Sequence, residues 1–198
     1  MGIGDQFNKM VGKTRYVVSR IFLQLNGTEV TPVLGVLNQA GRQMIEADGD
    51  ITITGECLVE VCQSLLQYEH AWRSAGNEGD MMWEEGQAGG YVNELFTDSA
   101  QRYLSDPDPG QTRSAEELTL PPTPNLVVMI TVAFTGTDDT IEANLADVGA
   151  MKVALKSLIN LHYQNRLEAI QVHFSPAQLG DQLSDDQVIQ NFPELLPL

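Results

Sequence analysis

The chain has 198 residues, of which 42% are hydrophobic and 19% are charged, a balance typical of a folded globular protein rather than a disordered one. A formal net charge of −16 and a pI near 4.3 argue against nucleic acid as a partner, because phosphate binding needs an excess of Lys and Arg. No apolar run reaches the roughly 18 residues of a membrane span, and the first residues lack the pattern of a signal peptide. The composition therefore predicts a soluble, cytoplasmic protein.

The first segment combines apolar periodicity with concentrated positive charge. Apolar residues recur at steps of three and four between positions 3 and 25, which predicts an amphipathic helix. Its basic residues are Lys9, Lys13, Arg15 and Arg20. Lys9, Lys13 and Arg20 fall within about 40° of one another on such a helix, and Arg15 flanks them. This basic stripe is either the solvated face of a packed helix or a docking face for an acidic protein or an anionic membrane surface.

Three further helices are predicted from the same periodicity, and they cover residues 31–46, 54–72 and 91–105. Thr31 is a suitable N-cap, and Pro32 stands at the first helical position, where its missing N–H is harmless. The short run 51–54 alternates like a strand but leads directly into the second of these helices, so we expect Thr54 to cap that helix. The part before residue 105 is thus expected to hold about four helices.

The two cysteines, Cys57 and Cys62, lie within the second of these predicted helices. Five residues of helix turn roughly 140°, so the two sulfurs point apart and cannot form a disulfide. The spacing predicts two free, buried thiols in a reducing compartment.

The segment from 75 to 90 is rich in glycine and acidic residues and is predicted to be a loop. Met81, Met82 and Trp83 lie within it, and such apolar side chains either pack back on the core or form a contact surface. The loop has no histidine and its acidic residues are irregularly spaced, which argues against a metal site. A calcium loop starting at Asp48 fails as well, because Ile53 replaces the required glycine. We expect no bound metal or cofactor.

The domain organisation is set by a proline-rich, acidic segment at 106–124, which predicts a linker. It separates a helical region at 1–105 from a smaller α/β unit at 125–198. A two-stranded sheet is rarely stable alone, so this unit is expected to be covered by the N-terminal helices, giving one domain, or by a second subunit, giving a homo-oligomer. The expected fold class is therefore α/β or α+β.

The unit at 125–198 is expected to contain a strand–helix–strand crossover. Residues 125–136 are almost entirely apolar, which favours a strand covered on both faces. A helix ending near 163 follows, and residues 167–176 alternate as a strand with one buried face. Such an arrangement predicts a parallel, right-handed crossover. Ser184 and Gln187 form the capping-box pattern of a short last helix.

A possible catalytic edge follows from the predicted parallel pairing. Both strands would end at the edge of the sheet that ligands favour, with Asp138 after the first strand and His173 and Ser175 at the end of the second. However, Ser175 precedes Pro176, and no nucleophile-elbow pattern surrounds it. We expect no catalytic residues, and a small hydrolase or ligand-binding domain using Asp138, His173 and Ser175 is the alternative.

Three C-terminal segments carry a family resemblance: "NLVVMITVAFTG", "LEAIQVHFSP" and "LSDDQVIQNFPELLPL", with "GECLVEVCQSLLQYEHAW" a weaker fourth. On these segments the chain resembles a domain-of-unknown-function family of cyanobacteria and chloroplasts. The resemblance covers residues 124–198 closely and residues 30–105 loosely. It implies a photosynthetic setting and an α/β C-terminal unit, and the family brings no established catalytic residues.

The leading functional expectation is a non-enzymatic accessory, assembly or adaptor protein. It would act through protein–protein contacts made by the basic stripe, by the loop containing Trp83, or by both. The first alternative is the small hydrolase or ligand-binding domain. The second is a peripheral membrane-associated protein, which would lie beside the thylakoid membrane in the setting that the resemblance implies.

Overall fold

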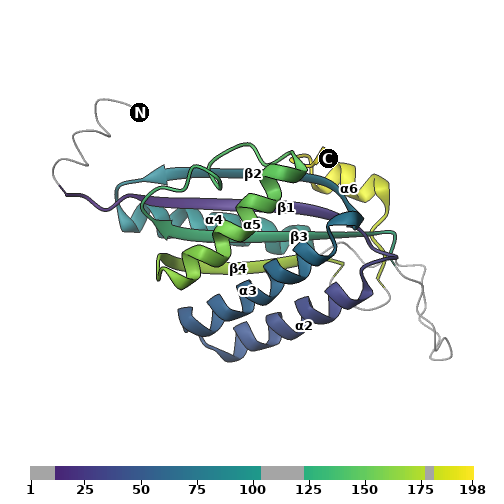
Figure 1. Ribbon diagram of the computed structural model, residues 1–198, viewed down its shortest axis with the longest axis horizontal. Helices are drawn as coiled ribbons and strands as arrows, with labels where there is room; N and C mark the ends of the chain where they lie inside the picture. The colour runs from purple at the N-terminus through teal and green to yellow at the C-terminus, as the bar shows by residue number, and fades with distance from the viewer. Residues whose placement is uncertain (1–11, 104–122, 177–180) are drawn as a thin grey trace.

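The computed structural model describes residues 12–103, 123–176 and 181–198, and its central element is a five-stranded sheet (Figure 1). The strands are β1 (Tyr16–Asn26), β2 (Trp72–Met82), β3 (Asn125–Thr135), β4 (Leu167–Ser175) and β5 (Leu196–Pro197). Their order is β4-β3-β1-β2-β5, and every neighbouring pair is antiparallel. The N-terminal and C-terminal parts of the chain therefore contribute strands to the same sheet.

Helices cover both faces of the sheet, which gives three layers (Figure 1). One face carries α2 (Thr31–Glu46), α3 (Ile51–Gln67) and α5 (Val148–Tyr163), and the other carries α4 (Glu85–Tyr103) and α6 (Asp185–Asn191). A short 3₁₀-helix, η1 (Glu69–Ala71), leads from α3 into β2. The large apolar core lies under α2, α3 and α5. The opposite face has two smaller clusters, one around Phe22 beside α6 and one around Val18 beside α4.

The predicted N-terminal region of four helices is wrong, because it begins with a strand and contains a second one. Residues 16–26 form β1, the central strand, whose residues between Tyr16 and Asn26 are all buried. A strand covered on both faces shows no strict polar–apolar alternation, so its apolar residues matched a helical spacing by coincidence. The glycine- and acid-rich segment expected to be a loop forms most of β2, and α4 begins at Glu85 rather than at residue 91.

The predicted parallel crossover is also wrong, because β3 and β4 are antiparallel. The chain leaves β3, passes through residues 136–147, and returns along α5 to the end of the sheet that it had just left (Figure 1). Two hydrogen bonds between Thr135 and Arg166 mark this return: the Thr135 N–H donates to the Arg166 carbonyl at 3.0 Å, and Arg166 Nε donates to the Thr135 carbonyl at 2.8 Å. The end of β3 is therefore beside the start of β4.

Several local predictions are confirmed. Helices α2 and α5, strands β3 and β4, and the short helix α6 lie close to the expected positions. Ser184 and Gln187 form the predicted capping box, and Cys57 and Cys62 are buried and unpaired. Helix α3 was predicted with the wrong cap: Asp50 caps it, and its carboxylate accepts hydrogen bonds from the N–H groups of Thr52 and Ile53. Of the predicted linker, only residues 123 and 124 are described.

Candidate functional site

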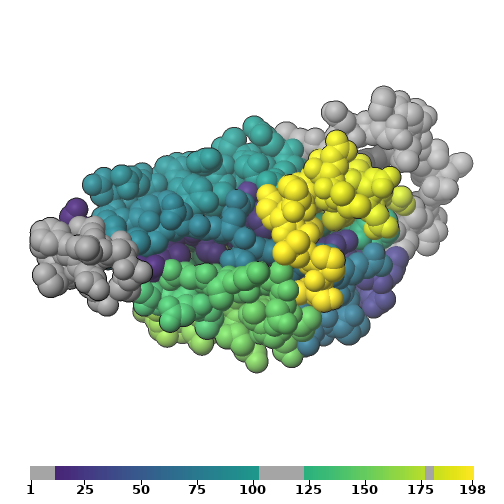
Figure 2. Space-filling model, turned by 90° about the horizontal axis from the view of Figure 1, so that it is seen from above, coloured from purple at the N-terminus to yellow at the C-terminus, as the bar shows by residue number. Residues whose placement is uncertain are grey.

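A groove of about 620 Å³ runs along β2. Its walls come from β1, β2 and residues 141–144, and the C-terminal residues Glu194 and Leu196 lie at one end. Figure 2 shows the hollow between the teal segments and the green segments, with the yellow C-terminal segment beside it. Concave sites of this kind are where binding is generally found in proteins.

The groove is open because small residues line the sheet there. Gly79 pairs with Ser19 of β1, and neither residue has a side chain that could fill the space above the sheet. A Cβ at Gly79 would lie 2.5 Å from the Val18 carbonyl oxygen, so glycine is required at this position. The opposite wall is fixed by Asn77, whose side chain donates to the Ala143 carbonyl and accepts from the Leu145 N–H, both at 2.9 Å.

One edge of β2 faces this groove without a strand partner. The last strand, β5, pairs only with Ser74 and Ala75 of β2, and no other strand of the described residues pairs with positions 76–82 on that side. We call residues 76–82 the open edge. The Leu198 N–H donates to the Arg73 carbonyl, and backbone groups on a strand alternate in direction. The N–H and C=O groups of Asn77, Gly79 and Met81 therefore face the groove side, where the Asp80 carboxylate accepts from the Met81 N–H at 2.7 Å.

The groove is acidic. Four carboxylate residues contribute to its lining, and no Lys or Arg is among the described residues that do so. The four are Glu78, Asp80, Glu142 and Glu194. Three of them are paired with arginines that stand behind the lining, and Asp80 is the exception among the described residues.

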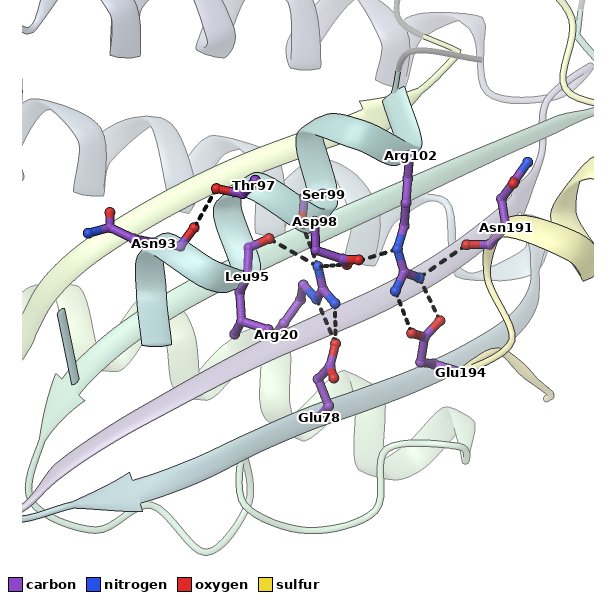
Figure 3. Close-up of polar contacts among 10 residues, drawn as sticks. All are labelled: Arg20, Glu78, Asn93, Leu95, Thr97, Asp98, Ser99, Arg102, Asn191 and Glu194. Carbon is purple, nitrogen blue, oxygen red and sulfur yellow. Dashed lines mark hydrogen bonds and ion pairs between the residues drawn. The ribbon is translucent and has the colours of Figure 1, made fainter. Parts of the chain in front are cut away.

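The first of these arginines, Arg20, is buried at the centre of β1 with 2% of its surface exposed. Its side chain lies between the sheet and α4 and is surrounded by acceptors (Figure 3). Nε donates to Glu78 Oε1 at 2.8 Å, and Nη1 lies 2.6 Å from Asp98 Oδ2. Nη1 also donates to the Leu95 carbonyl at 3.1 Å and to Ser99 Oγ at 2.8 Å. A buried cation needs such complete pairing to be tolerated.

The second arginine, Arg102 of α4, links the same cluster to the C-terminal segment (Figure 3). Its guanidinium binds Glu194 through two hydrogen bonds of 2.7 Å, and Nε lies 2.9 Å from Asp98 Oδ2. Both guanidinium groups also lie over the ring of Phe22, at 4.8 Å for Arg20 and 5.5 Å for Arg102. This arginine cluster, Arg20 and Arg102 with Glu78, Asp98 and Glu194, carries two positive and three negative charges.

Arginines of the cluster and at the end of the groove lower the pKa of several carboxylates. For both Asp98 and Glu194, burial alone raises the pKa, but hydrogen bonds and attraction from Arg20 and Arg102 outweigh burial and hold the pKa below its ordinary value. At the far end of the groove, burial also raises the pKa of Glu142, and hydrogen bonds from Arg15 and from the Asp138 N–H again lower it overall. These groups therefore stay ionised in the folded state at pH values where the unfolded chain takes up protons.

We expect the free energy of unfolding to fall as the pH drops below about 4.5. A carboxylate with a lowered folded-state pKa contributes stability above its unfolded pKa, near 4, and this contribution is lost as the pH falls through the folded pKa. Urea unfolding at pH 7, 5 and 3.5 measures this acid limb. In Glu194→Gln, one contributing group is removed, so the decrease between pH 5 and 3.5 should be smaller. An equal decrease in the variant would contradict the assignment to Glu194.

The described residues of the predicted basic stripe do not share one helical face, because residues 16–26 form a strand. Lys9 lies outside the described residues, and Lys13 is exposed. Arg15 donates to Glu142 and to the Gly136 carbonyl at the end of the groove, and Arg20 is inside the arginine cluster. Arg20 therefore has no surface on which a partner could dock.

The apolar residues of the predicted loop, Met81, Met82 and Trp83, are all partly buried. Met81 packs against the large core, and Met82 packs against the Val18 cluster on the other face. The alternation follows from the strand geometry of β2, in which successive side chains point to opposite faces. Both methionines thus pack back on the molecule, while Met81 also forms part of the groove wall.

Asp138, His173 and Ser175 do not come together. Ser175 is buried opposite Val127 at one end of β3, whereas Asp138 follows the other end. The strand from position 127 to 135 alone spans about 26 Å. The Asp138 carboxylate accepts hydrogen bonds from Thr140 and Ser157, which outweigh burial and lower its pKa. His173 packs on Phe96 with ring centroids 5.2 Å apart, and burial lowers its pKa, reinforced by Arg20.

Sequence reasoning missed the arginine cluster and the open edge. One signal was available: Arg20 stands inside a run of apolar residues, and an arginine buried in a strand requires acidic partners. The sequence does not show which acids these are, because Glu78, Asp98 and Glu194 come from three distant segments. The edge of β2 is open because β5 is only two residues long and covers no more than Ser74 and Ala75. A strand of two residues is too short to leave a pattern in the sequence.

The described residues include no metal-binding cluster and no membrane-crossing helix. No group of three or more His, Cys, Asp or Glu side chains in residues 12–103, 123–176 and 181–198 is placed to hold a metal ion. None of the helices in these ranges has the length and apolar character that crossing a bilayer requires.

An antiparallel sheet between two layers of helices, with an open strand edge beside an acidic groove, makes this a three-layer α+β protein. The chain belongs to DUF1517, a family of proteins of unknown function whose family model matches residues 15–198. The predicted membership of a domain-of-unknown-function family is thereby confirmed, and the match includes β1 and β2 as well as the C-terminal segments. Neither the curated proteins nor the solved structures contain a match to the chain.

Proposed function

We propose that this protein is a non-enzymatic adaptor or accessory protein that binds an extended segment of another protein along the open edge of β2. The observation that carries the proposal is the combination of an unpaired strand edge and a groove at the same place. A strand added to an exposed edge gains main-chain hydrogen bonds from the backbone and specificity from pockets for alternate side chains. Residues 76–82 offer the backbone, and the groove offers the pocket.

The other side of the sheet is less suited to this role. Strand β4, at the other side of the sheet, contacts both α3 and α4, and helices packed against an outer strand are a common way to hinder strand addition. In the described part of the chain, the open edge of β2 borders the groove. Its acidic residues instead discourage pairing with other acidic edges, which leaves it available to a selected partner.

The cellular setting of the proposal comes from the family resemblance of the C-terminal segments. We place the adaptor in the cytoplasm of a photosynthetic cell, with a position beside the thylakoid membrane as the further expectation. Binding to a protein partner, rather than to lipid, agrees better with the acidic groove, because an anionic membrane surface attracts clusters of Lys and Arg.

A peptide titration tests the proposal. The probe is a nine-residue peptide of alternating valine and threonine, added to ¹⁵N-labelled protein. We expect the largest amide shifts in NMR spectra at residues 76–82, with slower hydrogen exchange at Asn77 and Gly79, because their N–H groups gain acceptors.

The matched control is the same peptide with N-methyl groups at alternate positions, which removes its main-chain donors while keeping its side chains. Binding by strand addition requires that the N-methylated peptide binds much more weakly. Shifts confined to other elements, or equal binding of the two peptides, would contradict the proposed function.

A further inference from the structure

We infer that the segment bound by the open edge is an extended polypeptide of another protein with Lys or Arg at alternate positions and apolar residues between them. This inference rests on the proposed function and adds the chemistry of the partner. It follows from which side chains of β2 stand on each face of the sheet.

The first face of the bound segment would meet carboxylates. Residues directly opposite each other in neighbouring strands place their side chains on the same face, about 5 Å apart. Glu78 pairs with Arg20 on the α4 side of the sheet, and Asp80, two residues further, lies on that same side. Residues of the bound segment opposite Glu78 and Asp80 therefore lie next to two carboxylates, and basic residues fit these positions.

The second face would enter the groove. The residue opposite Gly79 meets no side chain on β2, and the groove lining includes the apolar residues Val17, Met81 and Ile141 beside the polar Asn77 and Glu142. Of the apolar residues, the two from the strands face the side of the sheet that carries α5. A medium-sized apolar side chain would bury its surface there, which is favourable by about 25 cal/mol per Å².

The charge balance selects the same partner. The arginine cluster has one more carboxylate than guanidinium groups, and Asp80 adds a carboxylate for which the described residues offer no cation. The chain as a whole carries −16. An acidic segment at this edge would be repelled, whereas a basic one would be attracted and held beside unpaired negative charge.

The same charges argue against a second copy of this chain as the occupant. If two open edges paired antiparallel about Gly79, Glu78 of each copy would stand opposite Asp80 of the other. Like charges directly opposite each other destabilise a strand pair. A different protein with a basic segment avoids this repulsion.

The test compares three nine-residue peptides that share valine at alternate positions and carry lysine, threonine or glutamate at the others. Affinities are measured by fluorescence anisotropy at low salt, and binding positions are mapped by NMR. We expect the lysine peptide to bind at least about tenfold more tightly than the glutamate peptide, since each favourable or unfavourable cross-strand charge pair contributes in the same direction. The ratio should shrink as salt screens the charges.

A pair of variants separates a local effect from the general charge of the protein. Asp80→Asn removes one charge at the open edge and keeps an acceptor for the Met81 N–H, while Glu168→Gln removes one exposed charge on β4. We expect Asp80→Asn to weaken binding of the lysine peptide about threefold and Glu168→Gln to leave it unchanged.

The outcomes distinguish the inference from the proposed function. Equal affinity of the three peptides, with shifts at residues 76–82, would overturn the basic partner and leave strand addition standing. Equal effects of Asp80→Asn and Glu168→Gln would also overturn the inference, because general attraction would then explain the preference. Failure of all three peptides to bind at the open edge would overturn both, and concentration-dependent self-association through residues 76–82 would assign the edge to a second copy.

Discussion

Replacing Arg20 with alanine is expected to lower the free energy of unfolding by about 3 kcal/mol. The change removes the cation that Glu78 and Asp98 share, and it removes donors from the Leu95 carbonyl and from Ser99. Breaking a buried ion pair typically costs about 3–5 kcal/mol, because the remaining charge is left without compensation. We expect the lower end of this range, since Glu78 and Asp98 are 34% and 40% exposed and water can reach them.

Urea unfolding at pH 7 measures this loss. The variant should remain folded, because native proteins are typically stable by about 5–15 kcal/mol. Arg15→Ala is the matched control. Arg15 also pairs with a carboxylate, Glu142, but 19% of the Arg15 side chain is exposed against 2% for Arg20, so water screens this pair more and a smaller loss is expected. If Arg20→Ala and Arg15→Ala lowered the stability equally, the arginine cluster would not be the buried, interdependent network that the distances indicate.

The position of Arg20 could not be predicted from the sequence. Its periodicity with Lys9 and Lys13 indicated an exposed helical stripe, and the structure places it inside the molecule. Apolar spacing alone does not separate an amphipathic helix from a strand buried on both faces, since the latter has no required alternation. The distinction depends on α4 covering β1, which is a tertiary contact.

Elements whose signals are local were predicted more successfully. The capping box at Ser184 and the apolar run that forms β3 depend on residues close together in the sequence, and both are confirmed. The direction of β4 depends instead on how residues 136–147 run back along the sheet before α5. The predicted edge with Asp138, His173 and Ser175 required parallel strands, so the error in strand direction removed that site as well.

The open edge is a case in which the sequence pattern concealed a strand. Residues 72–82 contain glycine and acidic residues, which are typical of loops and are also suited to an edge strand that avoids aggregation. Gly79 is needed where β2 closely approaches the backbone of β1, and Asp80 satisfies an outward N–H group. Glycine and acidic residues therefore have structural roles in this strand. The sequence alone does not show that the segment is a strand, because its identity depends on pairing with β1.

The largest loss of stability is expected for Phe22→Ala, at about 3–5 kcal/mol. The Phe22 ring is fully buried in the cluster that joins the sheet to α6. It also lies beneath both guanidinium groups of the arginine cluster. Alanine leaves a cavity and removes the aromatic face, whereas Phe22→Leu keeps most of the volume and should cost about 1–2 kcal/mol, mostly through the lost cation–π contacts.

Leu23→Ala provides a matched control for the local consequence, because Leu23 is the adjacent residue of β1 and is buried in the core on the opposite face. Both variants should lose several kcal/mol of global stability, but only Phe22→Ala should loosen α6 and residues 194–198, which the Phe22 cluster and Arg102 hold against the sheet. Hydrogen exchange measured under native conditions reads this difference directly. Faster exchange in α6 for Phe22→Ala alone would show that the Phe22 ring and the arginine cluster together anchor the C-terminal segment, which limits the open edge. Equal exchange in the two variants would refute this anchoring role.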